Sequence, residues 1–173
     1  FGDNPKFQLI MKDVLTLDFE EEIKEKVKVV ANIPYYITSP IINKLIENKE
    51  YVQDIFIMVQ KEVAERVCAK NGKERSVLTL SVEYFGEANY LFTIPKEFFT
   101  PPPKVDSAFM SINLFKENPF ENKVEEQEFF KYVKMAFSNK RKNILNNLSG
   151  LGINKTDLKE LLEKNGFSGN MRA

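Results

Sequence analysis

Apolar runs alternate with amphipathic stretches along the first part of the chain. Residues 27–31 form a Val-rich run typical of a buried parallel strand, and residues 55–59 are a second strand candidate. Between these runs, Ser39 is expected to cap and Pro40 to begin a helix whose apolar positions have helical spacing. Residues 61–70 predict the next helix. This strand–helix–strand–helix order predicts a parallel α/β sheet.

Shorter segments extend this pattern in both directions. Residues 7–11 are a short strand candidate, and the acidic and polar residues 18–26 predict a surface loop or a short helix. Residues 77–85 fit either a helix or a strand. A helix is favoured here, opened by Ser76 and ended by Gly86 as its C-cap.

A proline-rich connection, residues 98–106, joins two further strand candidates at residues 90–94 and 107–115. Loops held by a scaffold often provide binding groups, and this connection is more rigid than a spacer needs to be. The composition changes at Lys116-Glu117-Asn118-Pro119, which predicts a linker. We therefore expect two parts, an α/β part over residues 1–116 and a small all-α part over residues 117–173, with helices at 125–137, 138–148 and 156–164.

Composition narrows the function classes. Lys and Arg total 25 and Asp and Glu total 25, so a net charge of zero argues against nucleic-acid binding over the whole surface but allows a local basic patch. The absence of His and the single cysteine, Cys68, argue against a zinc site and against His-based nucleophilic catalysis. No internal disulfide can form, which fits a reducing, cytoplasmic setting. No apolar run approaches the length of a membrane span, so neither a metal nor a membrane is expected.

The four residues Asn32-Ile33-Pro34-Tyr35 form the most informative stretch, because they follow a predicted strand directly. In open α/β sheets, ligands bind at that end of a strand. The side-chain oxygen of Asn32 and the backbone carbonyl of Ile33 can accept two hydrogen bonds from one amino group, Pro34 has no N–H donor, and Tyr35 offers a ring face for stacking. The stretch thus suggests recognition of an exocyclic amine on a base. The alternative is an ordinary turn, because Asn and Pro both favour turns.

Further blocks, read in order, give the chain a specific resemblance. They are Ser39-Pro40, Gln60-Lys61-Glu62-Val63, the run from Phe99 to Ala108, Ala136-Phe137 with Lys140-Arg141-Lys142, and Met171-Arg172-Ala173. Together with residues 32–35, they resemble the KsgA-type ribosomal RNA adenine N6,N6-dimethyltransferases over essentially the whole chain. The run of residues 99–108 is the most specific block. Macrolide-resistance methylases share the element at residues 32–35 but fit this run and the helical tail less well.

This resemblance implies the second half of a Rossmann-like class I methyltransferase sheet and S-adenosylmethionine as the methyl donor. Asn32 and the carbonyl of Ile33 would accept hydrogen bonds from the target adenine N6, and Tyr35 would stack on the base while Phe99 packs on its other face. Asp13 and Val14 match positions that contact the cofactor's adenine, and Asn32 belongs to the same site. Asp13 could instead be a plain helix cap, and Phe99 a core residue.

The resemblance also implies contact with small-subunit ribosomal RNA. Lys140-Arg141-Lys142 is a local basic patch, and Lys104 lies in the proline-rich connection. Phosphate contacts from such residues position a protein on RNA. A solvated helix face would explain the patch equally well without any binding role.

One feature of the family is missing, namely the glycine-rich cofactor loop, which would lie upstream of Phe1. We therefore expect a fragment that binds S-adenosylmethionine weakly or not at all. Its exposed sheet edge should lead to self-association, domain swapping or dependence on the missing half. The leading hypothesis is dimethylation of two adjacent adenosines in the 3′-terminal hairpin loop of 16S ribosomal RNA. The alternatives are a non-catalytic RNA-binding or ribosome-assembly module, and a methyltransferase that acts on large-subunit RNA or DNA.

Overall fold

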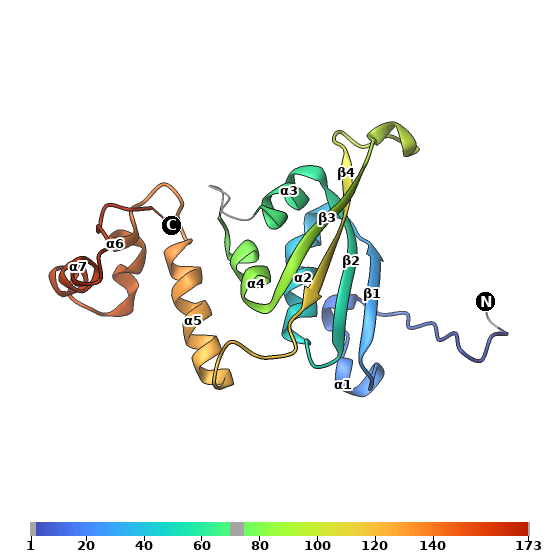
Figure 1. Cartoon of the computed structure of the whole chain (residues 1–173), viewed down its shortest axis with the longest axis horizontal. Helices are drawn as coiled ribbons and strands as arrows, with labels where there is room; N and C mark the ends of the chain where they lie inside the picture. Colours follow the sequence, from blue (N-terminus) through green and yellow to red (C-terminus); the bar gives the residue numbers. More distant parts are fainter. Residues whose placement is uncertain (1–2, 70–74, 173) are drawn as a thin grey trace.

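The computed structural model describes residues 3–69 and 75–172, which form a mixed four-stranded sheet, helices on one of its faces and a helical tail (Figure 1). The strands lie in the order β1-β2-β4-β3. β1 and β2 are parallel, whereas β4 runs antiparallel to both of its neighbours. The parallel sheet predicted from the sequence is therefore confirmed for the first two strands only. The strands are β1 (Val27–Asn32), β2 (Val52–Gln60), β3 (Gly86–Ile94) and β4 (Ser107–Leu114).

Three helices cover one face of the sheet. α2 packs on β2 and α4, and α3 packs on β2, β3 and β4, so that their apolar faces and the sheet enclose the core (Figure 1). The helices of the chain are α1 (Phe19–Glu22), α2 (Thr38–Glu47), α3 (Lys61–Cys68), α4 (Val77–Phe85), α5 (Lys123–Ala136), α6 (Ile144–Asn147) and α7 (Lys155–Lys164). Short 3₁₀ helices are η1 (Val14–Thr16), η2 (Tyr35–Ile37), η3 (Lys96–Phe98) and η4 (Leu148–Leu151).

The sequence expectation of a strand buried on both faces is wrong for β1. Residues along β1 alternate between partly buried and exposed, and Val30 is 74% exposed. β1 has only β2 as a neighbour within the described residues, so it forms an edge of the sheet. A Val-rich run raises β propensity but does not determine whether both faces are covered.

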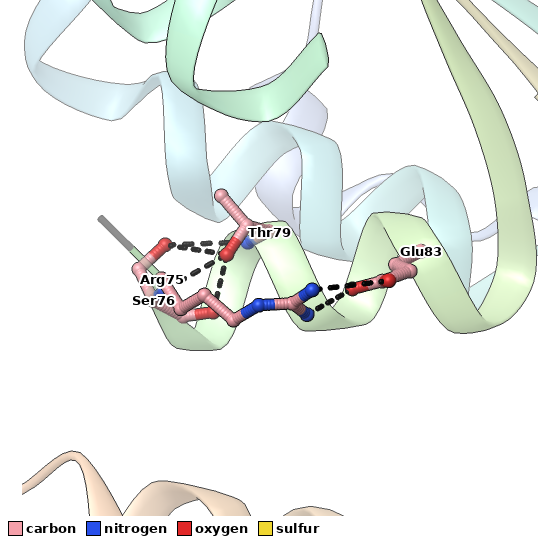
Figure 2. Close-up of polar contacts among 4 residues, drawn as sticks. All are labelled: Arg75, Ser76, Thr79 and Glu83. Atoms are coloured by element: carbon pink, nitrogen blue, oxygen red, sulfur yellow. Dashed lines mark hydrogen bonds and ion pairs between the residues drawn. The ribbon is translucent and has the colours of Figure 1, made fainter. Parts of the chain in front are cut away.

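The ambiguous segment after residue 76 is a helix, as predicted. Ser76 caps α4 by accepting a hydrogen bond from the backbone N–H of Thr79, and the Thr79 hydroxyl accepts one from the backbone N–H of Ser76 (Figure 2). This reciprocal pair satisfies two donors that a helix end leaves open. Arg75 forms an ion pair with Glu83 across the exposed side of the same helix (Figure 2). Capping thus selects a helix where the apolar pattern alone did not.

Gly86 is the C-cap of α4, as predicted, and its N–H donates a hydrogen bond to the carbonyl of Val82. Its backbone is extended, with φ of −168°, rather than left-handed, and the residue also begins β3. A Cβ at this position would lie 2.8 Å from the carbonyl oxygen of Asn113. Glycine is needed here because the backbone of β4 approaches closely, not because of a positive φ.

Three other sequence predictions are corrected. Residues 7–11 form no strand, since the described residues offer them no partner strand and Leu9 and Met11 are largely exposed. α2 begins at Thr38 rather than Pro40, and Ser39 is not its N-cap. Residues 138–143 form a turn instead of the start of a helix. The helix predicted over residues 61–70 is confirmed to Cys68, but Lys70 lies outside the described residues.

The helical tail joins the α/β part through an aromatic cluster. The rings of Tyr84 and Phe85 on α4 contact those of Phe120, Phe129 and Phe130 at centroid separations of 4.5–6.3 Å. A salt bridge of 3.0 Å between Lys49 and Glu126 lies at the same junction, and the ammonium of Lys49 sits 4.3 Å from the centre of the Phe85 ring. Aromatic pairs of this kind stabilise a packed contact beyond the area they bury.

Candidate active site

Three sequence blocks that are far apart in the chain meet at one edge of the sheet. Asn32 ends β1 and is paired with Met58 near the end of β2. Gln60 ends β2 and is paired with Ser107, the first residue of β4. The element at residues 32–35, the block that begins at Gln60 and the end of the proline-rich connection therefore converge at the carboxyl ends of the two parallel strands, where open α/β sheets bind ligands.

Asn32 and Ile33 present two free hydrogen-bond acceptors at this edge. Asn32 is exposed, and within the described residues neither its side chain nor the carbonyl oxygen of Ile33 has a protein hydrogen-bond partner. Pro34, with φ of −61°, is the N-cap residue of η2, and its own carbonyl accepts a hydrogen bond from the N–H of Ile37. Pro34 thus holds the carbonyl of Ile33 in one orientation, and the turn of η2 provides the hydrogen bond to the carbonyl of Pro34 itself.

Tyr35 is held in place by its hydroxyl group. The hydroxyl oxygens of Tyr35 and Ser107 are 2.5 Å apart in a hydrogen bond, and Ser107 is fully buried. The carbonyl of Tyr35 accepts a bond of 3.0 Å from the hydroxyl of Thr38, the first residue of α2. With both ends of the residue fixed, the half-buried ring has a defined position next to the free acceptors.

Asp106 fixes the proline-rich connection at its base. Its carbonyl accepts a hydrogen bond of 3.0 Å from the N–H of Lys61, and its carboxylate accepts one of 3.1 Å from the N–H of Lys96. Phe99 is half-buried in this loop, and its ring does not contact that of Tyr35 within the described structure. Lys104 is exposed and lines an open cavity of about 420 Å³ together with Lys61 and Lys96.

Asp13 and Val14 lie at the start of η1, which packs against α2, as η2 does. One carboxylate oxygen of Asp13 accepts a hydrogen bond of 2.9 Å from the N–H of Leu15, so the residue is the N-cap of η1. The other carboxylate oxygen has no partner among the described residues. Val14 is half-buried against the core. Asp13 is thus the helix cap that the sequence analysis gave as the alternative. Its second carboxylate oxygen is still free to accept a hydrogen bond.

Lys140, Arg141 and Lys142 are exposed on the turn between α5 and α6, away from the sheet edge (Figure 1). Asn139 shapes this turn by accepting hydrogen bonds from the backbone N–H groups of Arg141 and Lys142. The buried Asn147 side chain donates to the carbonyls of Ala136 and Asn139, at 2.6 and 3.0 Å. The basic side chains thus project from a turn with a defined backbone, not from a helix face.

Three residues of this region were not identified from the sequence as site residues. Ser107 and Asp106 belong to the run of residues 99–108, but only the structure shows that one anchors Tyr35 and the other fixes the loop. Tyr36, which the sequence analysis gave no role, is 85% exposed beside Tyr35. Tyr35, the partner of Ser107, and Lys61, one partner of Asp106, lie far along the chain from these residues, which explains why the local pattern did not reveal the two roles.

The pKa of Cys68 bears on whether this residue can act as a nucleophile. Burial raises the pKa of the Cys68 thiol to about 11, so the thiol stays protonated near neutral pH. The described residues include no group of His, Cys, Asp and Glu side chains that could hold a metal ion. Within the same residues, no helix has the length and apolar character needed to cross a membrane.

Comparison with known proteins gives a consistent result. The family described as ribosomal RNA adenine dimethylase matches residues 1–172. A ribosomal RNA small subunit methyltransferase A of Fusobacterium nucleatum is 60% identical over 173 residues, which cover 100% of this chain and 66% of the relative. The protein of that name in Hydrogenovibrio crunogenus is 40% identical over 156 residues, with 87% and 58% covered.

Two solved structures are similar in fold and sequence. The 23S rRNA methyltransferase ErmE superimposes with a TM-score of 0.65 at 25% identity, covering 93% of this chain and 63% of that one. A dimethyladenosine transferase from Plasmodium falciparum gives a TM-score of 0.61 at 30% identity, covering 80% and 49%. The chain spans less than two thirds of the length of each of these four proteins. The family match over nearly all residues confirms the resemblance stated from the sequence: the chain belongs to the ribosomal RNA adenine dimethylase family.

Proposed function

We propose that the protein to which this chain belongs transfers methyl groups from S-adenosylmethionine to the N6 amines of two adjacent adenosines in the 3′-terminal hairpin loop of 16S ribosomal RNA. One observation gives the main support: the side chain of Asn32 and the carbonyl of Ile33 are free acceptors beside the anchored ring of Tyr35. Two acceptors and a ring face match the needs of an adenine taken out of its stack.

The residues at the sheet edge act by orientation. Asn32 and the Ile33 carbonyl accept the two N6 hydrogens, which directs the nitrogen lone pair away from both acceptors. Tyr35 holds one face of the base, and Phe99 closes on the other. Fixing the amine in line with its electrophile provides most of the rate gain through proximity, and the two acceptors stabilise positive charge that develops on nitrogen. The methylated nitrogen then loses a proton to solvent water.

The residues of η1 fit the cofactor. The free carboxylate oxygen of Asp13 can accept a hydrogen bond from the cofactor's adenine amine, and Val14 gives an apolar contact. When bound, S-adenosylmethionine supplies a methyl group on a positively charged sulfur. Asn32, at the end of β1, takes part in both sites.

The RNA contacts follow from charge. Lys104 lies in the proline-rich connection, which ends at Ser107, the hydrogen-bond partner of Tyr35, and Lys140, Arg141 and Lys142 lie on the tail. We assign phosphate contacts to these four residues and treat residues 1–116 as the catalytic part and residues 117–173 as the RNA-contacting part. A ribosomal substrate also implies a cytoplasmic protein.

The test is a methyl-transfer assay on small ribosomal subunits that lack adenine dimethylation. We would use this chain alone and a chimera in which it replaces the matched 66% of the Fusobacterium nucleatum relative. We expect the chimera to form N6,N6-dimethyladenosine, and the chain alone to form less because its 173 residues include no glycine-rich turn.

Two variants distinguish loss of the active site from loss of the fold. Asn32→Ala in the chimera should lower the transfer rate by about 100-fold or more, the scale seen when one preorganised hydrogen-bonding group is removed. Asn89→Ala, which removes another exposed strand amide, is the matched control and should keep the rate. An Asn32→Ala chimera with full activity, or a chimera that binds RNA without forming product, would overturn the proposal.

A further inference from the structure

An open cavity of about 630 Å³ separates α5 from α2 and α4, on a different part of the molecule from the candidate active site. Figure 1 shows α5 standing beside α4 at this junction. The aromatic cluster and the Lys49–Glu126 salt bridge hold α5 there, so the groove has fixed walls. We call it the α5 groove. Residues from all three helices line it, among them Asn43, Phe130, Lys131, Lys134 and Met135.

Lysines form the rim of the α5 groove along one side of α5. Lys123, Lys131 and Lys134 are all exposed, and within the described residues none lies within ion-pair distance of a carboxylate. Of the two acidic residues that line the groove, Glu126 is neutralised by Lys49 at 3.0 Å, and only Glu47 has no salt-bridge partner in the described part of the chain. The groove therefore presents excess positive charge although the chain as a whole has none.

The interior of the α5 groove is apolar, whereas its rim is charged. The half-buried side chains of Phe130 and Met135 lie among its lining residues, and Ile46 and Val77 contribute from the opposite side. A flat apolar ring can lie against such a surface while lysines contact charges attached to that ring. A cavity of this size is within the range that holds a nucleotide-sized ligand.

The groove leads toward the basic turn. Lys134 lies in the last turn of α5, and Lys140, Arg141 and Lys142 follow on the turn that Asn139 and Asn147 shape. Consecutive lysines along a helix and its following turn are suited to a chain of phosphates rather than to a single anion.

We propose that the α5 groove binds a single-stranded segment of RNA, with phosphates on Lys123, Lys131 and Lys134 and a base against Phe130 and Met135. This inference rests on the RNA substrate proposed above and extends it to a second contact region. Each lysine would neutralise one phosphate and release counterions, so binding should weaken as salt concentration rises.

The first test measures binding of a fluorescein-labelled, twelve-nucleotide single-stranded RNA to the whole chain by anisotropy, over a range of salt concentrations. The variant Lys131→Gln/Lys134→Gln should bind about 25-fold more weakly at 0.1 M salt, with a slope of log affinity against log salt reduced by about 1.4, the values for two lost phosphate contacts. The matched control, Lys159→Gln/Lys164→Gln, removes two exposed lysines from α7 and should leave both values unchanged.

A second variant tests the groove rather than its charge. Asn43→Trp places a large ring from α2 into the groove without changing any charge, and it should weaken RNA binding about tenfold. Circular dichroism checks that each variant is folded. Equal losses in the α7 control, no effect of Asn43→Trp, or no RNA binding by the wild-type chain would each overturn the inference.

Competition separates RNA from an acidic protein partner. An unlabelled RNA of the same sequence should displace the probe, whereas a polyglutamate peptide of equal charge should not. Displacement by both to the same extent would indicate a general anion surface and would reject the proposal. Because the assay needs no methyl donor, its failure is distinct from a failure of the transfer assay with the chimera.

Discussion

The hydroxyl group of Tyr35 forms a hydrogen bond with that of Ser107, a residue 72 positions later in the chain. This bond ties the loop after β1 to the first residue of β4. Ser107 is fully buried and has no other side-chain hydrogen-bond partner within the described residues. The position of the proposed base-stacking ring therefore depends on a buried contact between the two ends of the site.

Removing one hydroxyl should destabilise the chain. Tyr35→Phe leaves the Ser107 hydroxyl buried without a partner, so we expect the free energy of unfolding to fall by about 1–2 kcal/mol. Ser107→Ala should cost a similar amount. The double variant should lose clearly less than the sum of the two, as measured by urea denaturation in a double-mutant cycle. Additive losses would show that the two hydroxyls are not coupled.

Gly86→Ala should destabilise the sheet. The new Cβ would lie 2.8 Å from the carbonyl oxygen of Asn113, and because that oxygen belongs to the backbone of β4, relief requires the strands to move apart. We expect a loss of about 1–3 kcal/mol in thermal or urea unfolding. Gly169→Ala is the matched control, since its nearest neighbour would be 3.5 Å away. Equal stability of both variants would contradict the close approach.

The thiol of Cys68 should react slowly with alkylating reagents. Burial raises its pKa to about 11 from the ordinary thiol value of 9.0, so at pH 8 the thiolate fraction in the folded chain should be about a hundredfold below that of an unperturbed thiol. Iodoacetamide labelling followed by mass spectrometry checks this, with the urea-unfolded chain as the control. Because the raised pKa favours the protonated folded form, stability should fall as pH rises from about 9 to about 11.

Phe130→Ala should loosen α5 from α4. The ring contacts those of Tyr84, Phe85 and Phe120, and its loss removes a central member of the cluster. We expect a loss of about 3 kcal/mol in unfolding free energy and faster hydrogen exchange along α5. Tyr132→Ala, on the same helix, is the control because that ring is 45% exposed and joins no ring contact of the cluster. Similar exchange in both variants would argue against the cluster as the anchor.

The exposed edge at β1 should promote self-association. Val30 is 74% exposed, Met11 is 84% exposed, and β1 has a free edge within the described residues. Such edges and apolar side chains favour pairing with another copy. Light scattering should therefore detect species above monomer mass, and Val30→Lys should reduce them. A monodisperse monomer at all concentrations would contradict this expectation.

Much of the fold could be predicted because its determinants are local. The apolar runs of β1 and β2, the cap at Ser76 and the helical spacing in α5 are each visible within a few residues. The reversed direction of β4 could not be predicted in the same way, because strand direction depends on pairing between distant segments. The failure of residues 7–11 to form a strand has the same cause, since a strand needs a partner.

The candidate site could likewise be predicted only where its determinants are local in the sequence. Asn32 and Tyr35 stood out because their chemistry is visible in four consecutive residues. Ser107 and Asp106 gained their roles only when the sheet register placed Ser107 opposite Gln60. The excess charge of the α5 groove was equally hidden, because it depends on Lys49 neutralising Glu126 across 77 positions.

The two hydrogen bonds made by Asp106 have a practical consequence. They close the connection between β3 and β4 at its base, with one bond to Lys61 on α3 and one to Lys96. The segment between Lys96 and Asp106 can therefore be exchanged as a cassette, since its two ends are bonded to each other and Asp106 is also bonded to α3. Grafting loops of other lengths and charges at these two anchor points offers a route to altered RNA selectivity on an unchanged scaffold.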